Sequence, residues 1–456
     1  MRFISFTFRF FSITQGPLVL ITILTFGCKQ KPHDHPHNVA HNHAYSDYGP
    51  LIFPSKHPDQ VILNLAENPL QAVAVNWRTD TTVTSGSVEV AVATHGPSFR
   101  EQKRTIAAQT QSFTNQYKQE PTVKAHYHEA LIDKLSPGEI YVYRVGIDTV
   151  WSEWFQIRIP DLSEKPLRFI YFGDAQNEVK SMWSRVIRQA YSTLPEVDFM
   201  LHAGDLINRS NRDREWCDWF YAGSFIHATI PSVMTPGNHE YSNVVLSPQW
   251  RPQFNLPTNG PPGLEETCYQ INYPDLKVIS LDAEQIDESP TFKKAQMIWV
   301  DSILENDPRK WTAVTLHYPL FSTKPDRDNP ELRAGFKPIF DKYQVDIVLQ
   351  GHDHAYGRGT VQNESTGTNK QDPSSGTMYV VSVSGPKMYD LREDTWMDRR
   401  AANTQLFQII SIEKDTLNYQ AFTALGTLYD EFDLVKSQIS GNELIDKIPN
   451  TPERIN

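Results

Sequence analysis

Six side chains of metal-binding types follow short apolar runs of this sequence, at the point where each run ends. They are carboxylates, one carboxamide and imidazoles: Asp174, Asp205, Asn238, His317, His352 and His354. Glycine stands directly before four of them, and glycine allows the tight turns that carry a short side chain into a shared site. A single pair such as His352 and His354 arises easily by chance. Recurrence at five successive runs predicts a metal site assembled from several strands.

The apolar runs before these residues are typical of buried strands. Helical periodicity separates some of them, at residues 179–191 and 292–306. Strands that alternate with helices indicate an α/β domain. In such domains the carboxyl ends of the strands form the crevice where ligands bind. The predicted strands are residues 167–172, 197–203, 230–236, 276–282, 311–316, 345–349 and 378–385.

Residues 55–160 show a different pattern. Short runs alternate between polar and apolar residues, as in 71–80, and turn residues separate them. This pattern predicts an antiparallel β-sandwich of roughly 100 residues. Residues 131–146 resemble the fibronectin type III signature, with a leucine, a Pro-Gly turn and alternating tyrosines on the next strand. Another kind of small sandwich is the alternative.

Five short blocks occur in the order found in the calcineurin-like metallophosphoesterases. With the sandwich before them, the sequence resembles the purple acid phosphatase-like branch of that family. The resemblance implies an α/β fold of two mixed sheets flanked by helices over residues 161–435, with 436–456 as a C-terminal tail. The blocks are GDAQ at 173–176, GDLIN at 204–208, GNHE at 237–240, TLHYP at 315–319 and GHDHAYGR at 351–358.

The resemblance also implies two divalent or mixed-valence metal ions, of iron, zinc or manganese. Asp174 and His354 would hold the first ion, and Asp205 would bridge both. The second ion would be held by Asn238, His317 and His352. A metal-bound hydroxide would attack phosphorus. Asn238 and His239 would face the substrate, with His239 binding a phosphate oxygen and protonating the leaving oxygen.

Two positions depart from the family pattern. Purple acid phosphatases have a tyrosine, the source of their colour, where this chain has Asn208. The resemblance therefore implies a colourless protein, in which Asn208 is a weak oxygen ligand or lies behind the ligands. Gln176 stands where the family usually has glycine, so we expect it to reshape that wall of the pocket.

The predicted function is metal-dependent hydrolysis of small phosphate esters, as an acid phosphatase-like phosphomonoesterase. A phosphodiesterase or nucleotide hydrolase on the same site is one alternative. A cell-surface binding protein on an inactive phosphoesterase scaffold is another. The net charge of −11 argues against nucleic acid bound through a basic surface.

The first 28 residues are typical of an export signal. Arg2 and Arg9 precede the apolar residues 18–26, and Cys28 follows, as in bacterial lipoprotein signals. We therefore expect a periplasmic or cell-surface protein with a lipid anchor at Cys28, or plain secretion with cleavage nearby. Residues 29–54 are expected to be a flexible tether, either a plain linker or a loose metal binder. The tether contains five histidines: His33, His35, His37, His41 and His43.

Two further cysteines, Cys217 and Cys268, follow the tether. They could pair in an oxidising compartment, and the sequence leaves this open, as it leaves open the oligomeric state.

Overall fold

The structure is a computed structural model that describes residues 52–163, 165–361, 376–393, 396–436 and 441–455. The predicted signal segment 1–28, Cys28 and the five histidines of the tether lie outside these residues. Within the described ranges, no helix is long and apolar enough to cross a membrane. Cys217 and Cys268 are both buried and unpaired.

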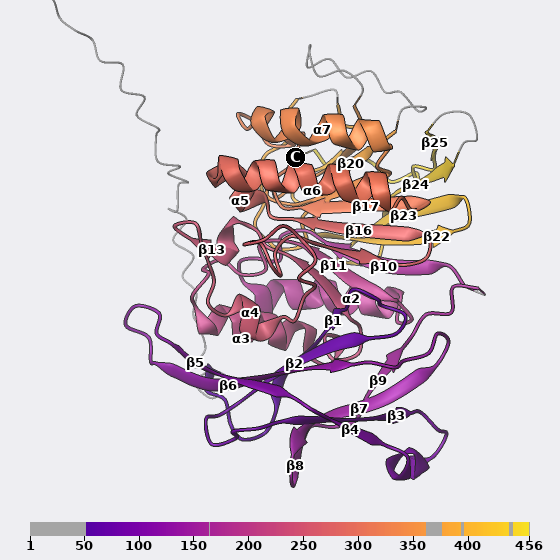
Figure 1. Ribbon diagram of the computed structural model, residues 1–456. Helices are drawn as coiled ribbons and strands as arrows, with labels where there is room; N and C mark the ends of the chain where they lie inside the picture. The colour runs from indigo at the N-terminus through magenta and orange to yellow at the C-terminus, as the bar shows by residue number, and fades with distance from the viewer. Residues whose placement is uncertain (1–51, 164, 362–375, 394–395, 437–440, 456) are drawn as a thin grey trace, which may run out of the picture. The chain divides into compact units, whose positions relative to one another are not determined.

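Two mixed sheets form the centre of the larger domain, which follows the N-terminal β-domain in the chain (Figure 1). In one sheet β10, β11 and β12 are parallel neighbours, and β10 also pairs with the antiparallel β22. In the other, β16, β17, β18 and β20 run parallel. The expected fold of two mixed sheets with flanking helices is therefore confirmed. Strand bounds in the first sheet are β10 (Leu167–Phe172), β11 (Phe199–Ala203), β12 (Ser232–Thr235), β22 (Leu406–Glu413), β23 (Thr416–Thr423) and β24 (Leu428–Lys436). Those in the second are β15 (Tyr269–Asn272), β16 (Leu276–Leu281), β17 (Trp311–Leu316), β18 (Ile347–Gln350), β19 (Tyr356–Thr360), β20 (Met378–Val381) and β21 (Arg399–Ala401).

Strand β18 shows why these segments are buried on both faces. Its alternate residues Ile347 and Leu349 lie in the core between the sheets, whereas Val348 packs with the helices α6 and α7. The helices α2 and α3 contribute to the core on the side of β10 and β11. Figure 1 shows the resulting order of helix, sheet, sheet and helix. The helices are α2 (Ser184–Thr193), α3 (Asp213–Gly223), α4 (Trp250–Gln253), α5 (Ala283–Glu288), α6 (Pro290–Asn306) and α7 (Pro330–Tyr343).

The predicted helix over 179–191 begins differently from an ordinary α-helix. Residues Val179–Trp183 form one π-helical turn, η2, which leads into α2. Trp183 is buried there and its indole N–H donates to the Ser384 hydroxyl over 2.9 Å. Its ring lies against His202, which is packed among aromatic rings.

The N-terminal β-domain is confirmed as all-β, and one of its sheets continues the first sheet of the larger domain. Strand β1 pairs in parallel with β12 through Asn64 and Ser232, which joins both parts in one sheet of 11 strands. The Asn64 side-chain amide also donates to the Ser232 carbonyl. The strands of this domain are β1 (Asp59–Leu65), β2 (Val73–Thr79), β3 (Ser87–Val92), β4 (Arg104–Ala107), β5 (Gln109–Asn115), β6 (Val123–Ile132), β7 (Ile140–Ile147), β8 (Val150–Trp151) and β9 (Phe155–Arg158).

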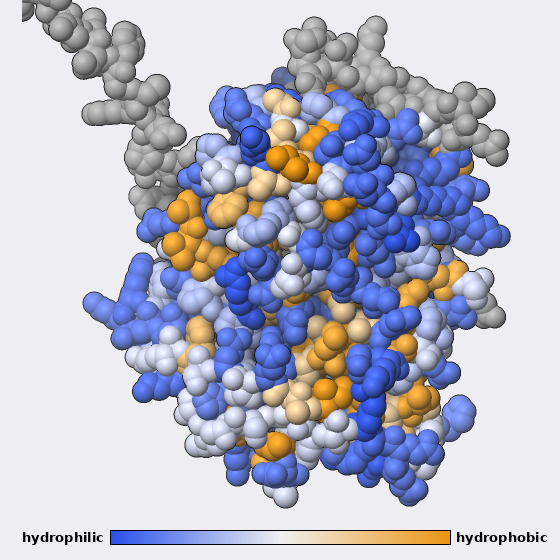
Figure 2. All heavy atoms as spheres, in the orientation of Figure 1, coloured by the Kyte–Doolittle hydropathy of each residue, from blue (hydrophilic) through white to orange (hydrophobic). Residues whose placement is uncertain are grey.

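The end of the chain also joins a sheet. Within residues 436–456, expected to be a tail, β25 (Asn442–Asp446) pairs with β24 at the edge of the larger sheet. Arg454 forms an isolated bridge with Ala401. The described part of this segment is therefore held to the domain by backbone hydrogen bonds. Figure 2 shows a largely hydrophilic face in the same orientation, with apolar side chains in separate small groups.

Candidate metal centre

The candidate ligands meet where the two sheets present the carboxyl ends of their strands. Asp174 follows β10 and Asp205 follows β11, both in the larger sheet. His317 follows β17, and the pair His352 and His354 follows β18, in the smaller sheet. Because parallel strands end at one edge, each sheet delivers its ligands to the same place. The structure thus brings together residues up to 180 positions apart in the sequence.

Unusual backbone conformations aim these side chains. Asp174, Asp205, His352 and His354 all have positive φ, at 27°, 53°, 72° and 48°. Non-glycine residues rarely adopt such angles, and they concentrate at functional sites. Close packing explains the neighbouring glycine Gly351, because a Cβ there would lie 2.5 Å from Asp174 Oδ2.

Asp205 is shared between two groups of potential ligands. The first group is Asp205, His317 and His352, and the second is Asp174, Asp205 and His354. Within each group the ligand atoms all lie within 4.8 Å of one another. Oδ2 of Asp205 is 3.2 Å from Nε2 of His317, and Oδ1 of Asp174 is 3.7 Å from Nε2 of His354. The Asp205 carboxylate is therefore common to a group with two imidazoles and a group with one imidazole and a second carboxylate.

Hydrogen bonds to backbone carbonyls orient the imidazoles. Nδ1 of His317 donates to the Ala203 carbonyl over 2.8 Å, and Nδ1 of His354 donates to the Lys387 carbonyl over 3.1 Å. Each bond leaves the Nε2 atom on the side of the carboxylates Asp205 and Asp174. Nδ1 of His352 lies 3.2 Å from Nε2 of His317. These contacts prepare imidazole nitrogens as ligands without a rearrangement of the rings.

Asn238 and His239 lie on the short helix η4 (Asn238–Glu240), directly after β12. The Oδ1 atom of Asn238 is buried and has no hydrogen-bond partner among the described residues. The backbone N–H of His239 donates to Asp205 Oδ1 over 2.9 Å. Its side chain is 18% exposed, and Nε2 lies 3.9 Å from Asp205 Oδ2. His239 is therefore partly exposed, as are Asn238 and His352, whereas Asp174, Asp205, His317 and His354 are buried.

Asn208 orients His239 through its backbone. The Asn208 carbonyl accepts a hydrogen bond from His239 Nδ1 over 2.8 Å, and its N–H donates to Glu215. No side-chain hydrogen bond of Asn208 is present among the described residues. Gln176 contacts the centre directly: its Nε2 atom lies 2.6 Å from Asp205 Oδ2 and 3.0 Å from His354 Nε2. The Gln176 side chain thus lies inside the site, in contact with two of the candidate ligands.

The electrostatics of the centre favour bound cations. Burial and repulsion from Asp205 raise the pKa of Asp174 to about 8, although His317 lowers it. Burial opposes the ionisation of Asp205, but His317 and His239 hold its pKa below the ordinary value. Burial also lowers the pKa of His352 and of His354. Burial acts in the same direction on His317, but Asp205 and Asp174 raise the pKa of His317 to about 9. A bound cation would therefore take the place of the His317 proton beside the two buried carboxylates.

Two supporting residues inside the quoted blocks were missed as candidates. The buried carboxylate of Glu240 accepts the backbone N–H groups of Asp205, Leu206 and Gly237 over 2.7–2.8 Å. Asp353, between the two histidines, points away and accepts the Arg327 guanidinium and the Thr323 N–H over 2.7 Å. Burial of carboxylates directly beside ligand positions is the signal that could have identified both.

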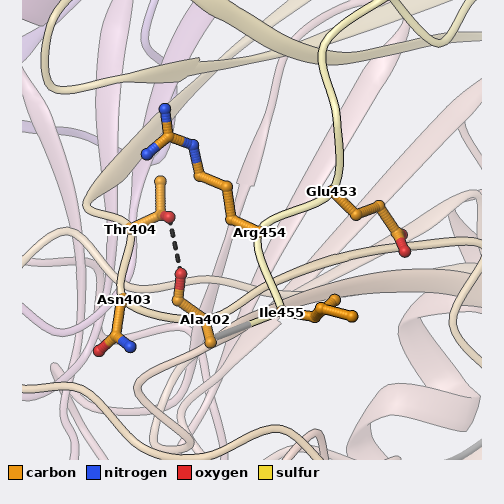
Figure 3. Close-up of a pocket in the computed structure, with 6 residues that line it drawn as sticks. All are labelled: Ala402, Asn403, Thr404, Glu453, Arg454 and Ile455. Carbon is orange, nitrogen blue, oxygen red and sulfur yellow. Dashed lines mark hydrogen bonds between the residues drawn. The ribbon is translucent and has the colours of Figure 1, made fainter.

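A pocket of about 220 Å³ lies elsewhere, at the C-terminal segment (Figure 3). None of its lining residues is a candidate ligand, and the only hydrogen bond drawn there joins the Thr404 hydroxyl to the Ala402 carbonyl. The lining residues are Ala402, Asn403, Thr404, Glu453, Arg454 and Ile455. This pocket is therefore separate from the candidate metal ligands.

Comparison with known proteins identifies both parts of the chain. Residues 58–159 match the purple acid phosphatase N-terminal domain, and residues 167–356 match the calcineurin-like phosphoesterase domain. An uncharacterized protein of Mycobacterium tuberculosis is 26% identical over 347 residues, which cover 68% of this chain and 64% of that protein. The match thus spans less than two thirds of that relative. Acid phosphatase type 7 of Homo sapiens is 25% identical over 338 residues, covering 68% of this chain and 72% of the human protein.

Purple acid phosphatase PPD1 from yellow lupin (Lupinus luteus) seeds shares the fold. It superimposes with a TM-score of 0.68 at 19% identity, covering 84% of this chain and 75% of the lupin chain. The order of the two matched domains agrees with the all-β domain and the paired mixed sheets described above. The chain therefore carries a domain similar to the purple acid phosphatase N-terminal domain at residues 58–159, followed by a calcineurin-like phosphoesterase domain at residues 167–356.

Proposed function

We propose that this protein is a metal-dependent phosphomonoesterase that hydrolyses small phosphate esters at a dinuclear centre. The observation that carries the proposal is the shared position of Asp205 between the His317–His352 group and the Asp174–His354 group. In two-metal hydrolases a bridging carboxylate of this kind holds two ions roughly 3.5–4 Å apart.

The spacing of the donor atoms fits metal ions. Ligands bound about 2.1 Å from one ion are roughly 3.0–3.4 Å apart at octahedral or tetrahedral angles. The atoms Asp205 Oδ2 and His317 Nε2 are 3.2 Å apart, as are His317 Nε2 and His352 Nδ1. The buried Oδ1 atom of Asn238 has no hydrogen-bond partner among the described residues, and it would be a further oxygen donor for the group that contains His317 and His352.

Bound ions would act as Lewis acids and lower the pKa of a coordinated water. The remaining steps belong to residues of this chain. His239 is held by the Asn208 carbonyl through Nδ1, so its Nε2 atom is available to a substrate. In the imidazolium form of His239, that atom would donate a hydrogen bond to a phosphate oxygen and pass its proton to the leaving oxygen. Water and the ester are converted to alcohol and inorganic phosphate.

The donor set of imidazoles, carboxylates and one amide oxygen suits zinc, manganese or iron. The backbone carbonyl of Asn208 contacts His239. The chain has this asparagine where the coloured phosphatases have a tyrosine. We therefore propose that the metal centre is less selective for iron(III) than the centre of the coloured phosphatases. Gln176 would have to turn its NH₂ group away when the ion of Asp174 and His354 binds, since its Nε2 atom lies against Asp205 Oδ2 and His354 Nε2.

Two substrates separate the candidate activities. The full chain, loaded in turn with zinc, manganese and iron, is assayed with p-nitrophenyl phosphate and bis-p-nitrophenyl phosphate. We expect turnover of the monoester to exceed that of the diester. A strong preference for the diester would move the assignment to a phosphodiesterase. Metal binding without turnover of either ester would favour the binding-protein alternative.

A further inference from the structure

Three cations surround the ring of Tyr389 beside the metal centre. The Nζ atoms of Lys324 and Lys387 lie 4.5 Å and 5.2 Å from the ring centroid, and the Arg327 guanidinium carbon lies 5.9 Å from it. The Tyr389 ring packs edge-on against His354, with centroids 4.7 Å apart. The positive charges therefore stand one aromatic ring away from a candidate ligand.

Backbone contacts tie the two cation-bearing segments to the turn that holds His352 and His354. The Lys387 carbonyl accepts from His354 Nδ1, and the Tyr389 N–H donates to the His354 carbonyl over 3.1 Å. On the other side the Lys324 N–H donates to Asp353, over 3.3 Å. The Arg327 guanidinium donates to the His352 carbonyl over 3.0 Å. Hydrogen bonds to the turn of His352 and His354 thus hold the segments that carry Lys324, Arg327 and Lys387 beside the site.

The local charge contrasts with the acidic chain as a whole, whose net charge is −11. Arg327 is neutralised by Asp353 over 2.7 Å. Within the described ranges, neither the Lys324 nor the Lys387 ammonium has a hydrogen-bond or ion-pair partner. Burial and repulsion from Arg327 lower the pKa of Lys324, although Asp353 and Asp326 oppose this effect. Lys387 also contributes to lowering the pKa of Lys324, so the two ammonium groups repel each other. A bound anion would relieve this repulsion.

We infer that Lys324 and Lys387, flanking Tyr389, form a subsite for a second anionic group of the substrate. The inference rests on the proposed phosphatase function and narrows its substrate class to phosphomonoesters that carry a further carboxylate or phosphate. The ester phosphate would lie at the metal centre, and the second anion would lie between the two ammonium groups. Tyr389 separates the two positions and would pack against the part of the substrate that links them.

A matched pair of esters tests the subsite. The metal-loaded full chain is assayed with 4-carboxyphenyl phosphate and with 4-carbamoylphenyl phosphate, which differ in one charge and little in shape. Charge-assisted hydrogen bonds predict a kcat/KM ratio of about tenfold in favour of the carboxylate. In the double variant Lys324→Met/Lys387→Met, the ratio falls to about one, while thermal unfolding shows that the variant is folded.

Lys342→Met is the control for the loss of a lysine away from the site. Lys342 lies on α7 and pairs with Asp301 at the surface, so its loss leaves the ratio at the wild-type value. A wild-type ratio near one, or an unchanged ratio in the double variant, would overturn the subsite while leaving the phosphatase function standing. Failure of every loaded preparation to hydrolyse either ester would instead overturn the proposed function, and this inference with it.

Discussion

The backbone N–H of Asp205 donates to the carboxylate of Glu240 over 2.8 Å. The same carboxylate accepts the N–H of Gly237 over 2.7 Å, so one buried group fixes the turns after β11 and β12. Those turns carry Asp205, which is shared by the two ligand groups, and the pair Asn238 and His239. Glu240 is therefore a positioning residue for three members of the site.

Replacing Glu240 with glutamine should destabilise the fold and weaken metal binding. The amide offers one acceptor oxygen instead of two and turns an NH₂ group toward backbone donors. We expect a loss of about 2–3 kcal/mol in the free energy of unfolding and a clear loss of metal affinity, measured by urea denaturation and metal titration. Glu305→Gln, at an exposed position on α6, is the control. Equal stability of the two variants would contradict this role of Glu240.

Replacing His239 with alanine should reduce kcat roughly a hundredfold or more, because general acid–base groups typically contribute that much. Metal content should stay at the wild-type level, since His239 stands outside both ligand groups. Elemental analysis and steady-state kinetics on the same preparation check both statements. Loss of metal together with activity would show that His239 is a ligand.

Replacing Gln176 with glycine, the residue usual in the family, should strengthen binding of one ion. The Gln176 Nε2 atom lies 2.6 Å from Asp205 Oδ2 and 3.0 Å from His354 Nε2, so its NH₂ group engages lone pairs that the ion would use. Chelator competition should therefore show that one of the two metal affinities rises about tenfold in the variant, as expected for the loss of a hydrogen bond to a charged group. If both affinities match those of the wild type, Gln176 does not compete with the ion.

Buried neutral histidines outside the centre should make the fold sensitive to acid. His227 stacks on Trp219 at 4.1 Å, and burial lowers its pKa from 6.5 to about 3. Between these values the unfolded chain binds a proton that the folded chain does not, so stability falls as the pH falls below about 6.5. For His227 alone this amounts to roughly 2–3 kcal/mol between pH 7 and 4.5.

The variant His227→Phe keeps a ring against Trp219 but cannot titrate. Its unfolding free energy should fall less than that of the wild type between pH 7 and 4.5. Urea denaturation at both values measures the difference, with the exposed His95→Gln as control. If the wild type and His227→Phe lose stability in parallel, His227 contributes nothing to the acid sensitivity.

The sequence was sufficient to predict the strands that carry the site. Residues 167–172 and 311–316 became β10 and β17 with the same bounds, because a strand buried on both faces is a continuous apolar run. The glycines and donor residues after these strands are local features, so the candidate ligands could be chosen from their spacing. The structure brings all of them to one place, and their roles as ligands remain predictions.

Relationships between distant segments could not be predicted. The pairing of Asn64 with Ser232 joins two domains across 168 residues, and no local pattern encodes it. The orientation of Asp353 away from the centre depends on the loop that contains Thr323 and Arg327. The position of Lys387 depends likewise on how its segment packs against His354. Such features follow from tertiary packing.

Metal content in variants of Asp205 tests the central claim most directly. The full chain carries alanine in place of the five tether histidines, so that only the folded centre can bind, and elemental analysis is made with and without Asp205→Asn. Sharing of Asp205 by both ligand groups predicts about two ions per chain, and fewer than one in the variant. An unchanged metal content in Asp205→Asn, or none in the parent chain after loading with zinc, manganese or iron, would contradict the dinuclear centre.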